Sequence, residues 1–170
     1  EQPWVLATKA YVLADVPGGR EEALSIFERI RTNHESSLSD RFFAIQIPLL
    51  LGEKDRAVAA AESWISDSPD GERSMWNEFE YFKIVATDGE YRPKQDNRLT
   101  KMLTNYFLGL LAIADGKRDR AIERFEESIE RPFVGLDAYW GEAFLRNLKR
   151  DSNWPSENPR MRREFDLRNE

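Results

Sequence analysis

The stretch Gly116-Lys-Arg-Asp-Arg-Ala121-Ile-Glu-Arg-Phe125 has two counterparts earlier in the chain. They are Gly18-Gly-Arg-Glu-Glu-Ala23-Leu-Ser-Ile-Phe27 and Gly52-Glu-Lys-Asp-Arg-Ala57-Val-Ala-Ala-Ala61. Each contains a glycine, four mostly charged residues, an alanine, and a second apolar residue four positions after the alanine. The alanines are 34 residues apart in the first interval and 64, close to two periods, in the second. A period of about 34 residues is the length of one helix–turn–helix unit in a stacked array. The sequence therefore predicts a helical repeat.

The composition is that of an ordinary folded domain and excludes several classes of site. The 170 residues are 41% hydrophobic and 33% charged, and the net charge of −6 argues against nucleic-acid binding. The chain has no cysteine, so it contains no disulfide and no thiolate metal site. The longest apolar runs, 42–51 and 107–114, are shorter than the roughly 18–20 residues of a membrane helix. The chain begins with Glu1 and shows no signal peptide, so we expect a cytoplasmic domain of a longer protein.

Helical periodicity dominates the chain, and alternating strand patterns are almost absent. It predicts helices at 4–15, 20–32, 41–51, 53–66, 72–86, 98–114, 118–130 and 136–149. Pro48 lies inside the third of these and should kink it. The polar stretch 88–97 contains Pro93 and predicts an irregular loop where a further repeat helix is due. We expect a helical repeat domain at 1–150 and a polar, flexible tail at 151–170.

The unit from Asn105 to Pro132 resembles a tetratricopeptide repeat. It carries the markers of that family at Leu108-Gly109, Gly116, Ala121, Phe125 and Ser128, with Pro132 one position early. The resemblance implies an all-α fold, a right-handed solenoid of antiparallel helix pairs with a C-terminal capping helix. The chain is similar to the divergent repeats appended to bacterial signalling proteins.

The resemblance also implies a non-catalytic scaffold that binds a peptide or a partner protein, since in this family the first helix of each pair lines a concave, peptide-binding face. The residues expected in that groove are Arg41, Gln46, Asn77, Tyr81, Lys101, Asn105 and Tyr106. Some members grip a C-terminal carboxylate with a lysine and an asparagine, but this chain has Tyr106 and Leu110 at those positions. A chaperone-tail clamp is therefore not expected.

Two further interpretations stay open. The chain could be a structural spacer or a dimerisation segment of a larger signalling protein, with exposed end helices docking onto neighbours, and an open or a filled concave face would separate the two. The aromatic stripe Trp76, Phe79 and Phe82 fits core packing, or an apolar patch on the concave face. The single histidine, His34, has no second histidine or cysteine to join it, and the carboxylate pairs fall on solvent faces. We therefore expect no catalytic residue, metal or cofactor.

Overall fold

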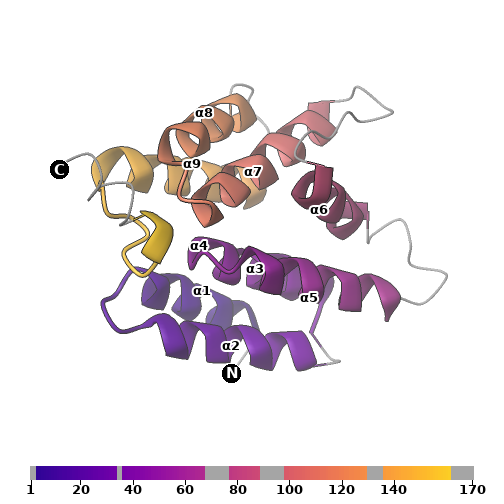
Figure 1. Ribbon diagram of the computed structural model, residues 1–170. Coiled ribbons are helices and arrows are strands. Elements are labelled where there is room, and N and C mark those ends of the chain that lie inside the picture. The colour runs from indigo at the N-terminus through magenta and orange to yellow at the C-terminus, as the bar shows by residue number, and fades with distance from the viewer. Residues whose placement is uncertain (1–2, 34–35, 68–76, 89–97, 130–135, 162–170) are drawn as a thin grey trace.

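The computed structural model describes residues 3–33, 36–67, 77–88, 98–129 and 136–161. Its helices are α1 (Pro3–Ala14), α2 (Arg20–Thr32), α3 (Leu38–Ala44), α4 (Gln46–Leu50), α5 (Lys54–Ser66), α6 (Asn77–Asp88), α7 (Arg98–Ala114), α8 (Arg118–Ile129) and α9 (Leu136–Arg150). Figure 1 shows these helices gathered side by side, with α1 to α5 on one side of the molecule and α6 to α9 on the other. No β-strand occurs within the described ranges, and the all-α prediction is confirmed.

The glycine that opens each sequence repeat lies in a turn between two helices. Gly18, Gly52 and Gly116 have φ values of +80°, +78° and +77°, a region where a residue with a Cβ is strained. At Gly52 and Gly116 the N–H of the following residue donates to the carbonyl five positions back, at 2.7 and 2.8 Å. The glycine N–H itself donates to the carbonyl three positions back, at 3.2 and 3.0 Å. The helices that precede Gly52 and Gly116, α4 and α7, therefore end with the same Schellman cap.

The small residues of the repeat lie where helices pack most closely. Ala23, Ala57 and Ala121 are fully buried. A Cβ added to Gly109 in α7 would lie 2.9 Å from the ring of Phe125 in α8, closer than van der Waals contact permits. The glycine of the Leu-Gly pair and the aromatic residue of the repeat are therefore in direct contact between α7 and α8.

The helix predicted at 41–51 is divided at Ile45 into α3 and α4. Pro48 explains the division, because it has no N–H to donate and its ring clashes with the carbonyl four residues earlier. The start of α3 is fixed by a capping box in which the Ser37 hydroxyl accepts from the Asp40 N–H, and the Asp40 carboxylate accepts from the Ser37 N–H. The helix is therefore interrupted within the segment where the sequence predicts a kink.

α6 interrupts the regular order of packing. α1 packs against α2, α4 against α5, and α7 against α8, while α6 lies between α5 and α7. α7 also packs directly against α4. The irregular loop expected at 88–97 lies, apart from Asp88 at the end of α6, outside the described residues.

α9 packs its aromatic side chains against three other helices. Its Trp140 ring is 4.9 Å from Tyr11 of α1 and 6.2 Å from Phe43 of α3, measured between ring centroids. Its Phe144 ring is 6.4 Å from Tyr106 of α7. One helix thus contacts three helices that are distant in sequence, and the core is continuous across them.

The segment after α9 packs against the rest of the molecule as far as residue 161, so the prediction of a flexible tail was wrong for residues 151–161. Trp154, Asn158 and Met161 are buried, and the Asn158 side chain donates from Nδ2 to the Ile113 carbonyl at 2.8 Å. The polar composition of this segment predicts exposure, but the polar side chain of Asn158 can be buried because it has a hydrogen-bond partner inside the protein. Residues 162–170 lie outside the described part of the chain.

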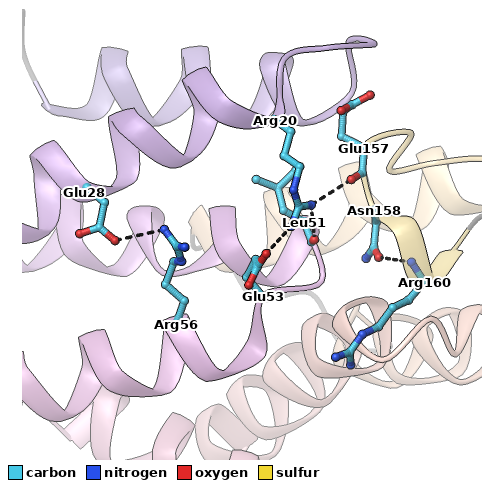
Figure 2. A network of polar contacts seen from close by, with 8 residues as sticks. All are labelled: Arg20, Glu28, Leu51, Glu53, Arg56, Glu157, Asn158 and Arg160. Atoms are coloured by element: carbon cyan, nitrogen blue, oxygen red, sulfur yellow. Dashed lines mark hydrogen bonds and ion pairs between the residues drawn. The ribbon is translucent and has the colours of Figure 1, made fainter.

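This C-terminal segment, residues 154–161, meets all three glycine turns. The Gly18 N–H donates to the Glu157 carboxylate at 3.2 Å. A Cβ added to Gly116 would lie 2.7 Å from the Arg160 carbonyl oxygen, so the segment also contacts the third turn. Figure 2 shows the Arg20 guanidinium bridging the segment to the second turn. It donates to the Leu51 carbonyl at 2.7 Å and the Glu157 carbonyl at 3.1 Å.

Candidate functional site

A cleft of about 140 Å³ opens between α5, α6, α7 and α8. Its floor is apolar and its rim is charged. The lining residues are Lys54 from α5, Val85 and Ala86 from α6, Leu108, Leu111 and Ala112 from α7, Asp115 and Lys117 from the turn that follows, and Arg120 from α8. The cleft therefore lies where α6 interrupts the regular packing.

Two of the residues on the cleft floor are alanines. Ala86 lies near the end of α6. Ala112 lies one turn after Leu108 on α7, so these two α7 residues are on the same face of the helix, which lines the cleft. Val85 and Leu111, which are buried, and the half-buried Leu108 supply the remaining apolar surface. A larger side chain at either alanine would fill the cleft.

The rim carries more positive than negative charge. Asp115 is the one acidic residue among the described residues that line the cleft, and its carboxylate is 3.1 Å from the Lys117 ammonium and 3.7 Å from the Arg160 guanidinium. Lys54 is half-buried, Arg120 is exposed, and neither makes an ion pair with another described residue. Within the described residues these two cations are thus without an ion-pair partner, on a chain whose net charge is −6.

Two residues expected in the binding groove are part of the core instead. Gln46 is 0% exposed and Tyr106 is 1% exposed, and the Tyr106 hydroxyl donates to the Gln46 Oε1 at 2.8 Å. This corrects their assignment to a partner-binding surface, because neither side chain reaches solvent. The aromatic ring of Tyr106 is instead covered by Phe144 of α9.

The other expected groove residues do not gather at one place. Arg41 is buried with its guanidinium carbon 5.9 Å from the centroid of the Trp64 ring, and burial lowers the pKa of Arg41 while Asp67 opposes the shift. Asn105 is half-buried and accepts a 3.3 Å hydrogen bond from Arg124, whereas Lys101 is exposed. None of these three residues lines the cleft. Asn77 and Tyr81 lie on α6, but their side chains are outside the described part of the structure.

The aromatic stripe expected at Trp76, Phe79 and Phe82 is visible only at its last member. Phe82 is fully buried, with its ring centroid 5.3 Å from that of Phe107. This favours core packing at that position. Trp76 and the side chain of Phe79 are outside the described residues.

The described residues hold no group of three or more histidine, cysteine, aspartate or glutamate side chains arranged to bind a metal ion. His34 lies outside those residues. Tyr11, whose pKa burial raises well above its usual value, donates its hydroxyl to the Phe43 carbonyl at 2.7 Å. That hydroxyl is neutral at physiological pH and ties α1 to α3.

Sequence reasoning did not find the cleft, although part of its signal is visible in the repeats. The charged run after the turn glycine includes a cation in every repeat, at Arg20 in the first, and the cations of the later two include Lys54, Lys117 and Arg120. Nothing in that pattern predicts that α6 would bring an apolar floor beside these cations. That depends on packing between α5, α6 and α7.

Comparisons of the chain with protein-family models, with curated proteins and with solved structures gave no match. Within the described ranges, every helix is too short or too polar to cross a membrane.

Proposed function

We propose that this chain is a non-catalytic helical module of the tetratricopeptide type that binds a segment of a partner protein. The proposal of paired, stacked helices rests on the repeated Schellman caps at Gly52 and Gly116 and on the packing of Gly109 against Phe125. The signalling role suggested by the sequence is part of this proposal. The partner segment lies in the cleft between α5, α6, α7 and α8, because Gln46 and Tyr106, two of the residues expected in the groove on the first helices, are buried in the core.

The cleft carries this proposal. An apolar floor combined with a charged rim is the arrangement of sites that anchor one side chain and orient its neighbours. The floor supplies burial of apolar surface, at about 25 cal/mol per Å². The rim cations add specificity more than affinity, because exposed ion pairs contribute about 0.2–1 kcal/mol each.

The test is selection of peptides from a random library against the unmodified chain and against Ala86→Leu, which fills the cleft. Ala59→Leu makes the same substitution at an exposed position of α5 and serves as the control. We expect selected peptides to bind Ala86→Leu at least ten-fold more weakly and Ala59→Leu unchanged, with circular dichroism verifying the fold of each. Equal binding to Ala86→Leu would exclude the cleft as the site.

A second candidate function is self-association through α1, as a dimerisation or spacer segment. Val5 and Val12 are 40% and 60% exposed and lie seven residues apart, on one face of the helix, and Val16 in the next turn is 45% exposed. A second copy of the chain would bury this apolar strip. Sedimentation velocity at micromolar concentration tests the idea: a dimer that Val12→Glu converts to a monomer supports it, and a monomeric unmodified chain contradicts it.

A further inference from the structure

The size of the cleft limits what can be anchored in it. A volume of about 140 Å³ is close to the roughly 150 Å³ of an apolar cavity that accommodates a group the size of benzene. One branched aliphatic side chain therefore fits, and two do not. The floor residues Val85, Leu108 and Leu111 offer apolar surface alone, so the anchor must itself be apolar.

The charge of the rim limits what can flank that anchor. Lys54 comes from α5 and Arg120 from α8, so these two cations, which form no ion pair with a described residue, border the cleft from different helices. The Asp115 carboxylate is held by Lys117 and Arg160 and does not neutralise them. Carboxylates placed on the residues before and after an apolar anchor would meet this pair of cations. A basic segment would bring like charges together at Lys54 and Arg120.

The same features disfavour other ligand classes. A nucleic acid needs a run of cations along a face, whereas the described part of this rim has two cations without an ion-pair partner, and the chain is acidic overall. A free inorganic anion would gain nothing from the floor. Only a ligand that joins an aliphatic group to nearby carboxylates uses both parts of the cleft.

We infer that the cleft recognises an acidic segment of a partner protein, in which one leucine-sized aliphatic side chain is flanked by aspartate or glutamate. This inference rests on the proposed binding function and adds the chemistry of the partner to it. Because the cations are at the surface, ionic strength screens them, and the affinity falls as salt is raised. The aliphatic anchor supplies the part of the affinity that salt does not remove.

The experiment uses a phage-displayed library of nine-residue peptides with a fixed central leucine and four random residues on each side. Peptides selected on the unmodified chain are sequenced, synthesised with fluorescein, and titrated by fluorescence anisotropy at 50 and 500 mM NaCl. The same peptides are titrated against Lys54→Glu/Arg120→Glu. The control is Arg29→Glu/Arg146→Glu, which makes the same change of charge at exposed positions on α2 and α9.

We expect aspartate and glutamate to be enriched beside the leucine, binding to weaken at least ten-fold in Lys54→Glu/Arg120→Glu, and the control to bind within two-fold of the unmodified chain. Selected peptides without acidic flanks would overturn the inference while leaving the proposed binding function intact. Acidic peptides that bind Lys54→Glu/Arg120→Glu normally would also overturn it, by placing their site elsewhere. No selected peptide at all would overturn both. Should the double variant fail to fold, an affinity that does not change with salt overturns the inference on the unmodified chain.

Discussion

The buried hydrogen bond between Tyr106 and Gln46 joins α7 to α4 through two polar side chains in an apolar core. Removing the hydroxyl leaves the Gln46 Oε1 buried without this donor, which costs about 1–3 kcal/mol. We therefore expect Tyr106→Phe to lower the free energy of unfolding by that amount in urea titrations followed by circular dichroism. Gln46→Met combined with Tyr106→Phe removes both polar groups and should cost less than the sum of the single changes. A cost for Tyr106→Phe within about 0.5 kcal/mol of zero would contradict this role.

The carboxyl group of Asp15 has a higher pKa in the native protein than in the unfolded chain. Burial raises the pKa of Asp15, the Asp151 charge adds to the shift, and the Ser156 N–H, 3.5 Å from its Oδ1, opposes it. Because the folded pKa lies above the unfolded one, the native state binds more protons. Its stability therefore falls as pH rises from the unfolded pKa through the raised one.

Asp15→Asn removes this penalty above the raised pKa and changes little below pH 3, where the carboxyl is protonated in both states. We expect the Tm difference between variant and unmodified chain to grow with pH and to reach about 1–2 °C at pH 7, small because Asp15 is largely solvated. Thermal melts from pH 3 to 7 measure it. Glu123→Gln, on the exposed side of α8, controls for the loss of one negative charge. A difference that is the same at every pH would refute the assignment to Asp15.

At the scale of the helices, two glycines make opposite predictions. Gly109→Ala would place a Cβ 2.9 Å from the Phe125 ring, and overpacking of this kind costs about 1–3 kcal/mol. A Cβ at Gly141 in α9 would lie 3.4 Å from the Ser128 Oγ and 3.6 Å from its other near neighbours, which is ordinary contact. Alanine is the better helix former by about 1 kcal/mol, so Gly141→Ala should stabilise the protein. Urea unfolding of both variants tests this, with Phe125→Leu expected to reduce the cost of Gly109→Ala. The same sign for both changes would show that helix propensity, and not the close approach, decides the result.

Helix positions were largely predictable because their signals are local. The predicted helices 20–32 and 98–114 coincide with α2 and α7, since turn glycines and amphipathic periodicity act over a few residues. Pro48 likewise divided its helix by a steric effect within one turn. The binding groove was not predictable in this way. Whether Gln46 faces solvent depends on Tyr106, 60 positions away.

At the scale of the whole molecule, the C-terminal segment connects turns that the sequence separates widely. The Ser156 hydroxyl donates to the Asp15 carbonyl at 2.8 Å across 141 positions, and the Asn158 side chain lies between Gly52 and the end of α7. Local patterns cannot reveal contacts of this range, which is why polar composition suggested a flexible tail. In Figure 1 the segment, drawn in yellow, lies between α1 and the helices α8 and α9. We infer that it holds the two sides of the molecule in one arrangement.

Asn158 is the residue through which this connection can be tested. Its Nδ2 donates to the Ile113 carbonyl at 2.8 Å, and its Oδ1 accepts from the Arg160 N–H at 3.0 Å. Asn158→Ala removes both hydrogen bonds, each of which contributes about 0.5–1.5 kcal/mol, and should therefore cost about 1–3 kcal/mol in urea unfolding. Because the segment contacts all three turns, amide hydrogen exchange should accelerate together around Gly18, Gly52 and Gly116.

Asn153→Ala, the same change at an exposed position of the chain just before the segment, is the control and should alter neither quantity. A second comparison separates contact from backbone strain. A Cβ on Gly52 meets the Asn158 Oδ1 at 2.8 Å, whereas a Cβ on Gly18 meets nothing within 4 Å, and both glycines have the same positive φ. Gly52→Ala should therefore cost more than Gly18→Ala in the unmodified chain, and the two costs should converge when Asn158 is alanine. If they stay apart, or if faster exchange is confined to the neighbourhood of residue 158, the segment packs against the helices without coupling them.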